Sequence, residues 1–270
     1  MFLRRTLPTI LLPLLAACDG GSPPDTGDVA SPDAPAPGAW LGYALCSAGD
    51  LDGDGYSDLF AGAPGAARGG LLSGAVLARS SHDGRVLARL DGTRARAVLG
   101  SALAALGDLD GDGVIDLAAG APKDATPGLA TGSIVVLSGR DLSRLWQKAG
   151  PAPGAHFGDA LANVGDVDGD GHADVVLGAS AASASGVEAG QVRLVSGATG
   201  AMLCVSDGER AFGWLGAAVA GVGDLDGDGR PDVAAGAPVH DDVLSLAGRV
   251  RVLGCAPFTP GVVHEPPLKH

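Results

Sequence analysis

The stretch Asp50-Leu51-Asp52-Gly53-Asp54-Gly55-Tyr56-Ser57-Asp58 places four carboxylates at positions 1, 3, 5 and 9 of a nine-residue loop, with glycine at position 6. Oxygen ligands at alternate positions suit a hard cation, because Ca²⁺ takes about 6–8 oxygens at roughly 2.3–2.6 Å. Without a cation, carboxylates this close would repel one another. The stretch therefore predicts a calcium-binding loop in which position 7 offers its backbone carbonyl.

The stretch occurs four times, and the copies begin 58 residues apart. The predicted ligands are positions 1, 3, 5, 7 and 9 of each copy: Asp50, Asp52, Asp54, Tyr56 and Asp58; Asp108, Asp110, Asp112, Val114 and Asp116; Asp166, Asp168, Asp170, His172 and Asp174; Asp224, Asp226, Asp228, Arg230 and Asp232. For one copy a solvated acidic turn is an alternative, since Asp and Gly favour turns. Four copies in register favour about four structural Ca²⁺ ions. An EF-hand is disfavoured, because position 12 is Ala or Leu instead of Glu.

The net charge of −13 arises from 31 acidic and 18 basic residues. Sixteen of the acidic residues are the aspartates of the four loops, so the rest of the chain carries 15 acidic against 18 basic residues. The acidity is concentrated in the loops, and the remaining basic residues leave no basic patch that could neutralise phosphates. We therefore expect no nucleic-acid partner.

The N-terminus has the features of an export signal over residues 1–17. Arg4 and Arg5 precede a short apolar run, residues 7–15, which is too short to span a bilayer. The following Leu15-Ala16-Ala17-Cys18 resembles the lipobox of bacterial lipoproteins, which implies cleavage before Cys18 and lipidation of its sulfur. A plain secretory signal is the alternative. Both interpretations predict export, and the first predicts a lipid-anchored protein at the bacterial cell envelope, in contact with the membrane through Cys18.

Three segments follow the signal. Residues 18–39 are rich in Pro, Gly and Asp, cannot bury a core and predict an extended tether after the lipidated cysteine. The repeats occupy residues 40–256. Residues 257–270 form a C-terminal tail, in which Val262-Val263 could add a strand to the last repeat.

Each repeat predicts four short strands, which in the second copy are residues 99–107, 116–122, 133–137 and a weaker strand around 145–147. Repeated units of four short strands are typical of β-propeller blades. Helical periodicity is absent. The sequence therefore predicts an all-β protein: a propeller of four blades.

Two further elements surround each loop. A Leu-Gly or Phe-Gly pair precedes it, at residues 41–42, 99–100, 157–158 and 215–216. A Gly-Ala-Pro turn follows it at residues 62–64, 120–122 and 236–238, whereas the third copy has Ser180 in place of Pro. Together these elements resemble FG-GAP repeats of the integrin alpha N-terminal type. The resemblance covers roughly residues 40–256 and implies a β-propeller with calcium in its loops.

The number of repeats is a departure, because integrin propellers have seven blades and this chain has four repeats. Four blades could close a small ring, since propellers of about 4–8 blades exist. They could form an open arc with exposed edges, or two chains could self-associate into a larger ring. We expect a closed four-bladed ring or a strongly curved arc.

The strand order assigns the loops to faces. In a four-stranded blade, the 1–2 and 3–4 loops lie on one face and the 2–3 and 4–1 loops on the other, so the four Asp loops share a face. The variable 2–3 loops, residues 123–130, 181–189 and 239–247, belong to the opposite face, where binding surfaces tend to be built. We expect a protein or glycan ligand there; the candidate contact residues are Lys123, Asp124, Trp214, His240, Asp241 and Asp242. Ordinary solvated loop residues are the alternative.

The sequence gives little support for an enzyme. It has no Gly-x-Ser-x-Gly elbow and no His-Glu-x-x-His. The expected function is a calcium-binding module for adhesion or for protein or glycan binding at the cell envelope. The alternatives are a purely structural surface protein and an enzyme that uses the central channel.

Three cysteines follow the lipobox: Cys46, Cys204 and Cys255. Export permits disulfides, and an odd count leaves at least one thiol free or paired between chains. Cys204 and Cys255 are the favoured pair. Three buried thiols are the alternative, because free Cys packs as a small hydrophobe.

Overall fold

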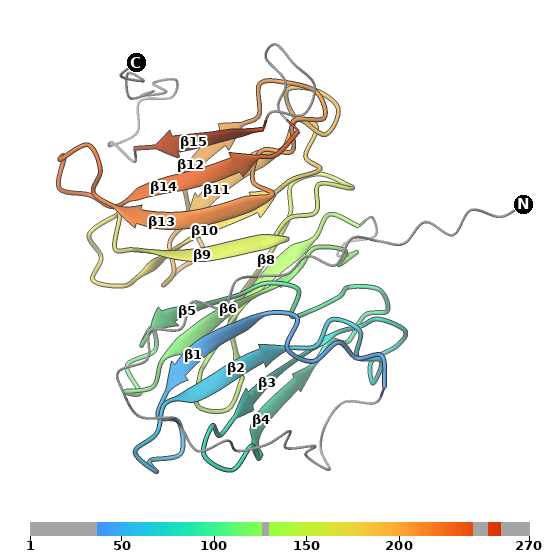
Figure 1. Cartoon of the computed structure of the whole chain (residues 1–270), viewed down its shortest axis with the longest axis vertical. Coiled ribbons are helices and arrows are strands. Elements are labelled where there is room, and N and C mark those ends of the chain that lie inside the picture. Colours follow the sequence, from blue (N-terminus) through green and yellow to red (C-terminus); the bar gives the residue numbers. More distant parts are fainter. Residues whose placement is uncertain (1–36, 126–129, 240–247, 255–270) are drawn as a thin grey trace, which may run out of the picture.

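The computed structural model of the chain describes residues 37–125, 130–239 and 248–254. Those residues form fifteen β-strands in four antiparallel sheets, and they contain no helix (Figure 1). Within each sheet the spatial order of the strands is their order in the chain. Each sheet is therefore an up-and-down unit, called a blade below, and the predicted all-β, propeller-type fold is confirmed.

The four blades have the following strands. Blade 1 contains β1 (Leu45–Gly49), β2 (Asp58–Gly62), β3 (Ala75–Arg79) and β4 (Val86–Asp91). Blade 2 contains β5 (Leu103–Gly107), β6 (Asp116–Ala121), β7 (Ser133–Leu137) and β8 (Arg144–Ala149). Blade 3 contains β9 (Ala160–Gly165), β10 (Asp174–Ala179), β11 (Gln191–Val195) and β12 (Met202–Asp207). Blade 4 contains β13 (Ala218–Gly223), β14 (Asp232–Ala237) and β15 (Arg249–Leu253) within the described residues, and the strand expected at Val262-Val263 lies outside them.

The first strand of each repeat is shorter than predicted. Strand β5 begins at Leu103, whereas the prediction began at Leu99. Gly100 has φ 85°, a left-handed conformation that interrupts a strand. The Leu-Gly and Phe-Gly pairs are therefore turns that lead the chain from one blade into the next.

The hydrophobic core lies between consecutive blades. Side chains of a strand alternate between its two faces, so Leu117 on β6 belongs to the cluster shared with blade 1, whereas Ala118 belongs to the cluster shared with blade 3. A third cluster joins blades 3 and 4 in the same way. Each blade is thus stabilised mainly by burial against its neighbours.

Small residues bring the blades into close contact. A Cβ added at Gly120, on β6, would lie 2.0 Å from the carbonyl oxygen of Gly158 in the lead-in of blade 3. Gly132 and Phe157 form a parallel bridge beside this contact. The glycine of Gly-Ala-Pro is therefore needed for blade packing.

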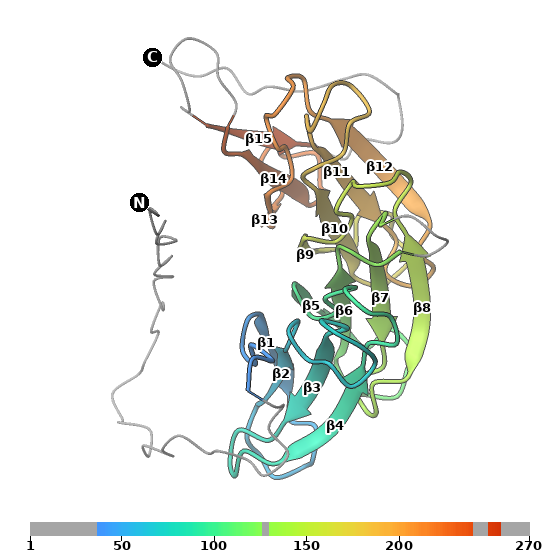
Figure 2. The same cartoon turned by 90° about the vertical axis from the view of Figure 1, so that its right-hand side faces the viewer.

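The four blades form an open arc (Figure 2). Strands β1, β5, β9 and β13 line its concave side, and β4, β8 and β12 lie on the convex side. The innermost strands pack in sequence, β1 on β5, β5 on β9 and β9 on β13. Of the two expected architectures, the structure has the curved arc, and the described residues do not close a four-bladed ring.

The arrangement of loops follows from the strand order. The Asp loops connect first and second strands, and in Figure 1 all four lie on the left of the molecule. The 2–3 and 4–1 loops lie at the opposite ends of the strands and are joined to each other, for example by Phe212 N donating to Val187 O at 2.7 Å. No helix among the described residues is long and apolar enough to cross a membrane.

Candidate metal centres

The aspartate at position 1 shapes each Asp loop. In blade 2, Asp108 Oδ1 accepts from Gly111 N at 2.7 Å and Asp112 N at 3.1 Å, while its Oδ2 accepts from Gly113 N at 2.8 Å. Gly111 and Gly113 have φ of 81° and 85°, which other residues adopt only with strain. The other three loops repeat these contacts. The loop is therefore wrapped around one carboxylate by its own amides.

The aspartate at position 9 ties the loop to the neighbouring hairpin. Asp116 is fully buried; its Oδ2 accepts from Leu109 N at 2.7 Å, and its Oδ1 accepts from Gly139 N, in the 3–4 loop, at 2.8 Å. Asp174 makes the same contacts in blade 3. Burial raises the pKa of both carboxyl groups, while the amide hydrogen bonds act in the opposite direction. Position 9 thus joins the 1–2 and 3–4 loops into one unit.

Blade 4 differs at this position. Asp232 is 1% exposed, and its Oδ2 accepts from Leu225 N at 2.8 Å, but its Oδ1 is buried and has no hydrogen-bond partner among the described residues. An unpaired buried carboxylate oxygen is costly unless a donor or a cation reaches it.

Three carboxylates converge in each loop. Ligand oxygens of positions 1, 3 and 9 lie within 4.8 Å of one another, and the four groups are Asp50, Asp52, Asp58; Asp108, Asp110, Asp116; Asp166, Asp168, Asp174; and Asp224, Asp226, Asp232. Oxygens bound at about 2.4 Å to a common ion are less than about 5 Å apart. The donor set and spacing therefore fit one divalent cation per loop.

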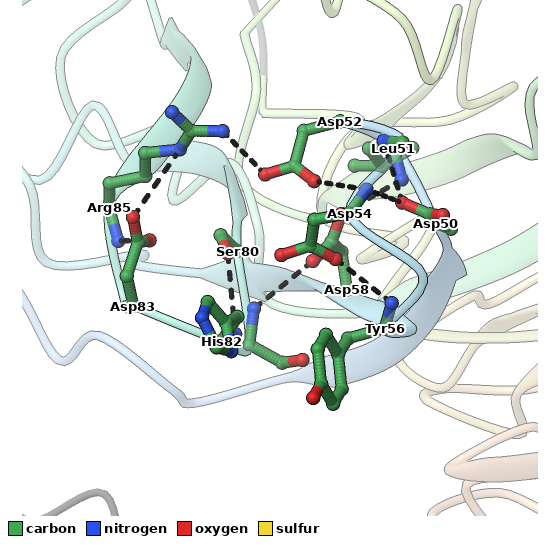
Figure 3. Close-up of polar contacts among 12 residues, drawn as sticks. Asp50, Leu51, Asp52, Asp54, Tyr56, Asp58, Ser80, His82, Asp83 and Arg85 are labelled. Atoms are coloured by element: carbon green, nitrogen blue, oxygen red, sulfur yellow. Dashed lines mark hydrogen bonds and ion pairs between the residues drawn. The ribbon is translucent and has the colours of Figure 1, made fainter.

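The position 5 aspartates, Asp54, Asp112, Asp170 and Asp228, are outside these groups. Each instead accepts a hydrogen bond from the position 7 amide, as Asp54 Oδ1 does from Tyr56 N at 2.9 Å. The Tyr56 side chain is 55% exposed and stacks on His82, with ring centroids 4.9 Å apart (Figure 3). The ligand roles of positions 5 and 7 stay predictions.

Sequence reasoning missed an arginine beside each of the first two Asp loops. Arg85 Nη2 lies 2.7 Å from Asp52 Oδ2 (Figure 3), and Arg140 Nε lies 2.6 Å from Asp112 Oδ2. The hydrogen bond from Arg140 lowers the pKa of Asp112. Both arginines belong to 3–4 loops, which share a face with the Asp loops, and that placement is the signal that could have identified them. The corresponding loop of blade 3, residues 196–201, contains no Lys or Arg.

A second missed feature explains why the third repeat lacks its proline. Ser180, which replaces that proline, donates a hydrogen bond to Asp159 Oδ2. The other oxygen, Oδ1, is buried without a hydrogen-bond partner. Burial raises the pKa of Asp159 to about 6. Asp159 and Ser180 therefore act as a pair, and the serine supplies a donor that proline lacks.

On the opposite face, the candidate contact residues differ in their exposure. Lys123 is exposed, whereas Asp124 is 4% exposed and accepts from Ser133 Oγ at 2.8 Å and Gln147 Nε2 at 3.3 Å. These contacts give Asp124 a structural role and remove it from the candidates. His240, Asp241 and Asp242 lie outside the described residues.

An aromatic patch surrounds another candidate, Trp214. Its side chain is 40% exposed, and its Nε1 donates to Glu188 Oε2 at 3.0 Å. Phe212 and Val187, which sequence reasoning missed, are 53% and 57% exposed. We call these four residues the Trp214 patch; it is formed where the 2–3 loop of blade 3 meets the lead-in of blade 4.

The cysteines are only partly described. Cys46 on β1 has a free thiol, and burial raises its pKa to about 11. Cys204 lies on β12, but its expected partner Cys255 is outside the described residues. That pairing stays a prediction, as do the signal, tether and tail boundaries.

Comparison with known proteins identifies the repeats. The FG-GAP repeat model matches residues 41–77, 157–195 and 215–253. Integrin alpha-PS2 of Drosophila melanogaster is 31% identical over 235 residues, covering 78% of this chain and 16% of that protein. Integrin alpha-V of Gallus gallus is 35% identical over 157 residues, covering 52% of this chain and 15% of that protein. Phosphatidylinositol-glycan-specific phospholipase D of Bos taurus is 32% identical over 243 residues, covering 76% and 27%.

The chain thus spans about a quarter or less of the length of these relatives, 16%, 15% and 27%. The second repeat, which the family model does not match, has the same strands, the same loop contacts and the same inter-blade glycine as the others. FG-GAP repeats of the integrin alpha type generally bind divalent cations, and proteins that carry them are typically extracellular, which agrees with export. The chain contains three FG-GAP repeats, is similar in sequence to integrin alpha chains, and has a propeller-type fold.

Proposed function

We propose that this protein is a non-catalytic, exported module that four Ca²⁺ ions stabilise on one face and that binds a protein or glycan ligand on the other. The observation that carries the proposal is the contrast between these faces. One face repeats the same Asp loop four times, whereas the other carries loops that differ in every repeat and expose aromatic side chains.

Calcium is the preferred ion on chemical grounds. Each loop offers only oxygen ligands, on a flexible loop with glycines, which suits Ca²⁺ better than the strict octahedron of Mg²⁺. Extracellular calcium modules have Kd values of about 10⁻⁴–10⁻³ M, which matches a calcium-rich exterior. In each loop an ion would hold together the 1–2 and 3–4 hairpins through position 9.

The Trp214 patch is the proposed ligand contact. Trp and other aromatic residues are enriched where partners bind, because they combine a large apolar surface with a polar edge. Backbone strain does not distinguish this site, since Trp40, Val98, His156 and Trp214 all have φ of 54–56°. What distinguishes it is that aromatic side chains occupy two strained, exposed positions, Phe212 and Trp214.

The test uses replacements taken from the third repeat, so that the backbone is preserved. Phe212→Gly and Trp214→His reproduce Gly154 and His156, which have the same left-handed φ. The double variant and the unaltered chain are compared on an array of glycans and purified envelope proteins, with Tyr56→Val, copied from Val114 on the Asp-loop face, as control.

Loss of a ligand in the double variant alone supports the proposal. A ligand that all three proteins bind equally would contradict the assignment of the site. If the unaltered chain binds nothing on the array, the purely structural alternative gains support. A hydrolytic product from any array component would revive the enzyme alternative.

The lipid anchor on Cys18 is the second part of the proposal. The basis is the Leu15-Ala16-Ala17-Cys18 signal and the tether that follows it. Detergent phase partition of the protein from cells should place the unaltered chain in the detergent phase and the Cys18→Ser chain in the aqueous phase. Equal partition of both would refute the anchor and leave a plain secretory signal.

A further inference from the structure

The described part of the chain contains three blade-to-blade interfaces of one construction. In each, a second-strand glycine packs against the lead-in of the next blade. A Cβ added at Gly62, Gly120 or Gly178 would lie 2.0, 2.0 or 1.8 Å from a carbonyl oxygen of that lead-in. Real Cβ atoms do not approach so closely, so these three interfaces accept only glycine.

The outer face of blade 4 has the same construction, but none of the described residues covers it as a next blade would. A Cβ added at Gly236, the equivalent of Gly178, would meet nothing closer than Ala218 Cβ of its own blade, at 3.7 Å. Val250 is 72% exposed, whereas its equivalents Val76, Ile134 and Val192 are 0%, 0% and 3% exposed. Blade 4 therefore presents an apolar face that the other three blades bury.

Blade 1 exposes part of the opposite half of the interface, although Leu77 of that half is buried beside the blade's own lead-in residue Ala39. Gly42, the equivalent of the covered lead-in glycines, has no atom within 4 Å of an added Cβ. Leu45 is 58% exposed, whereas its equivalent Leu103 is 9% exposed. Leu59 is 41% exposed, whereas Leu117, Val175 and Val233 at its position are 0–2% exposed.

The two free faces are complementary. In the interface between blades 3 and 4, the packed side chains are Leu215, Val219 and Val233 from blade 4 and Val176, Val192 and Leu194 from blade 3. Transferred by the 58-residue repeat, the equivalent positions are Leu41, Leu45 and Leu59 on blade 1 and Ala234, Val250 and Val252 on blade 4. Of these, Leu45, Leu59 and Val250 are exposed, whereas Leu41, Ala234 and Val252 are half-buried. The face of blade 1 therefore carries the kind of apolar side chains that cover the equivalent face of blade 3 within the chain. Contiguous exposed apolar surface of this kind marks an interaction site.

We propose that two copies of the chain associate head to tail, with blade 4 of each copy packed on blade 1 of the other, in a closed ring of eight blades. A head-to-tail interface forms either a closed ring or an open fibre. The arc that the described residues of one copy form does not close on itself (Figure 2). Two arcs give eight blades, within the known range of about 4–8. The proposal is independent of calcium and of the ligand face.

The test is the molar mass of the full chain carrying Cys18→Ser, measured by light scattering during gel filtration in calcium. The expected mass is that of two chains. Gly236→Ala should weaken dimerisation at least about tenfold without lowering the melting temperature of the monomer, because the added Cβ has room in one copy but would clash in the interface. Val250→Asp and Leu45→Asp, one on each face, should do the same.

Gly178→Ala is the matched control, because the same added atom inside the chain should destabilise every copy. A monomeric unaltered chain would overturn the proposal and mean that residues outside the described ranges cover both faces. A dimer that resists all three surface variants would place the contact elsewhere. A mass that grows without limit with concentration would refute the closed ring.

Discussion

Blades 2 and 3 are built on the same frame but balance charge differently. Their Asp loops make the same hydrogen bonds, and Asp116 and Asp174 are both fully buried at position 9. In blade 2, Arg140 pairs with the loop, whereas Ala198 stands at the equivalent position of blade 3. The backbone is thus fixed by contacts that repeat, while the charge around each loop is set blade by blade.

Blade 3 also holds the half-buried Asp159–Ser180 pair, where blade 2 has Ser101 and Pro122. With a carboxyl group whose pKa is about 6 and no basic residue in its 3–4 loop, blade 3 has more unbalanced negative charge than blade 2 near neutral pH. We therefore expect the stability of blade 3 to depend more strongly on pH and on calcium.

The largest effect is expected at position 9, where the two blades agree. Asp174→Ala leaves Val167 N and Gly197 N without their acceptor, and unsatisfied buried donors cost about 1–3 kcal/mol each, or about 2–6 kcal/mol together. Asp116→Ala should cost a similar amount. Urea unfolding in EDTA measures both. A loss below about 1 kcal/mol in either blade would mean that position 9 does not hold the loops together.

The next effect is a pH dependence of the free energy of unfolding that arises in blade 3 and not in blade 2. The folded-state pKa of Asp159 is raised from 3.8 to about 6, so the folded state binds more protons between these values and the free energy of unfolding falls as pH rises through this window. The penalty is fully present above about pH 7 and amounts to roughly 3 kcal/mol. Asp159→Asn should therefore stabilise the protein at pH 8 much more than at pH 4.5, as measured by urea unfolding.

Ser101→Asn, at the same position of blade 2, is the control and should show no such difference. If Asp159→Asn changes the free energy of unfolding equally at both pH values, burial does not raise the pKa of the Asp159 carboxyl group.

Replacing one carboxylate ligand tests whether the Asp loops bind calcium. Asp166→Ala should reduce the bound Ca²⁺ from four ions to three by removing the carboxylate around which the third loop wraps. Equilibrium dialysis with metal analysis counts the ions. Asp108→Ala in blade 2 should also remove one ion. Four ions in both variants would place the calcium outside the loops.

The smallest effect concerns the arginine. A cation beside the loop disfavours a second cation, so Arg140→Ala should tighten calcium binding by the second loop, and Ala198→Arg should weaken binding by the third, each within about tenfold. Calorimetric titration in low salt detects these changes. If Ala198→Arg leaves binding unchanged, exposed arginines do not set the differences between loops.

Much of this structure could be predicted because it repeats. The strand Ser133–Leu137 was predicted to the residue, since a short apolar run between turns has one reasonable interpretation. The Asp loops were predicted from spacing alone. The lead-in at Leu99–Gly100 was wrongly predicted as strand, because apolar residues beside a glycine can also form a turn that packs against the previous blade.

What could not be predicted depends on contacts that do not repeat. The 3–4 loops place Arg85 and Arg140 on the same face as the Asp loops, but the two arginines stand at different places in their loops, so the repeat does not show which carboxylate each reaches. The pairing of Asp159 with Ser180 required knowing that lead-in and turn are adjacent in space. The choice between arc and ring depends on small rotations between blades, which sequence patterns do not encode (Figure 2).

The central claim is that the four Asp loops are calcium sites that stabilise the blades. Thermal unfolding of the Cys18→Ser chain in EDTA and across a calcium titration tests it most directly. Four sites filled to ten times Kd should raise the melting temperature by about 10–20 °C, and the same concentrations of Mg²⁺ should raise it much less. A melting temperature that is the same in EDTA and in saturating calcium would contradict the claim and reduce the loops to hydrogen-bonded turns.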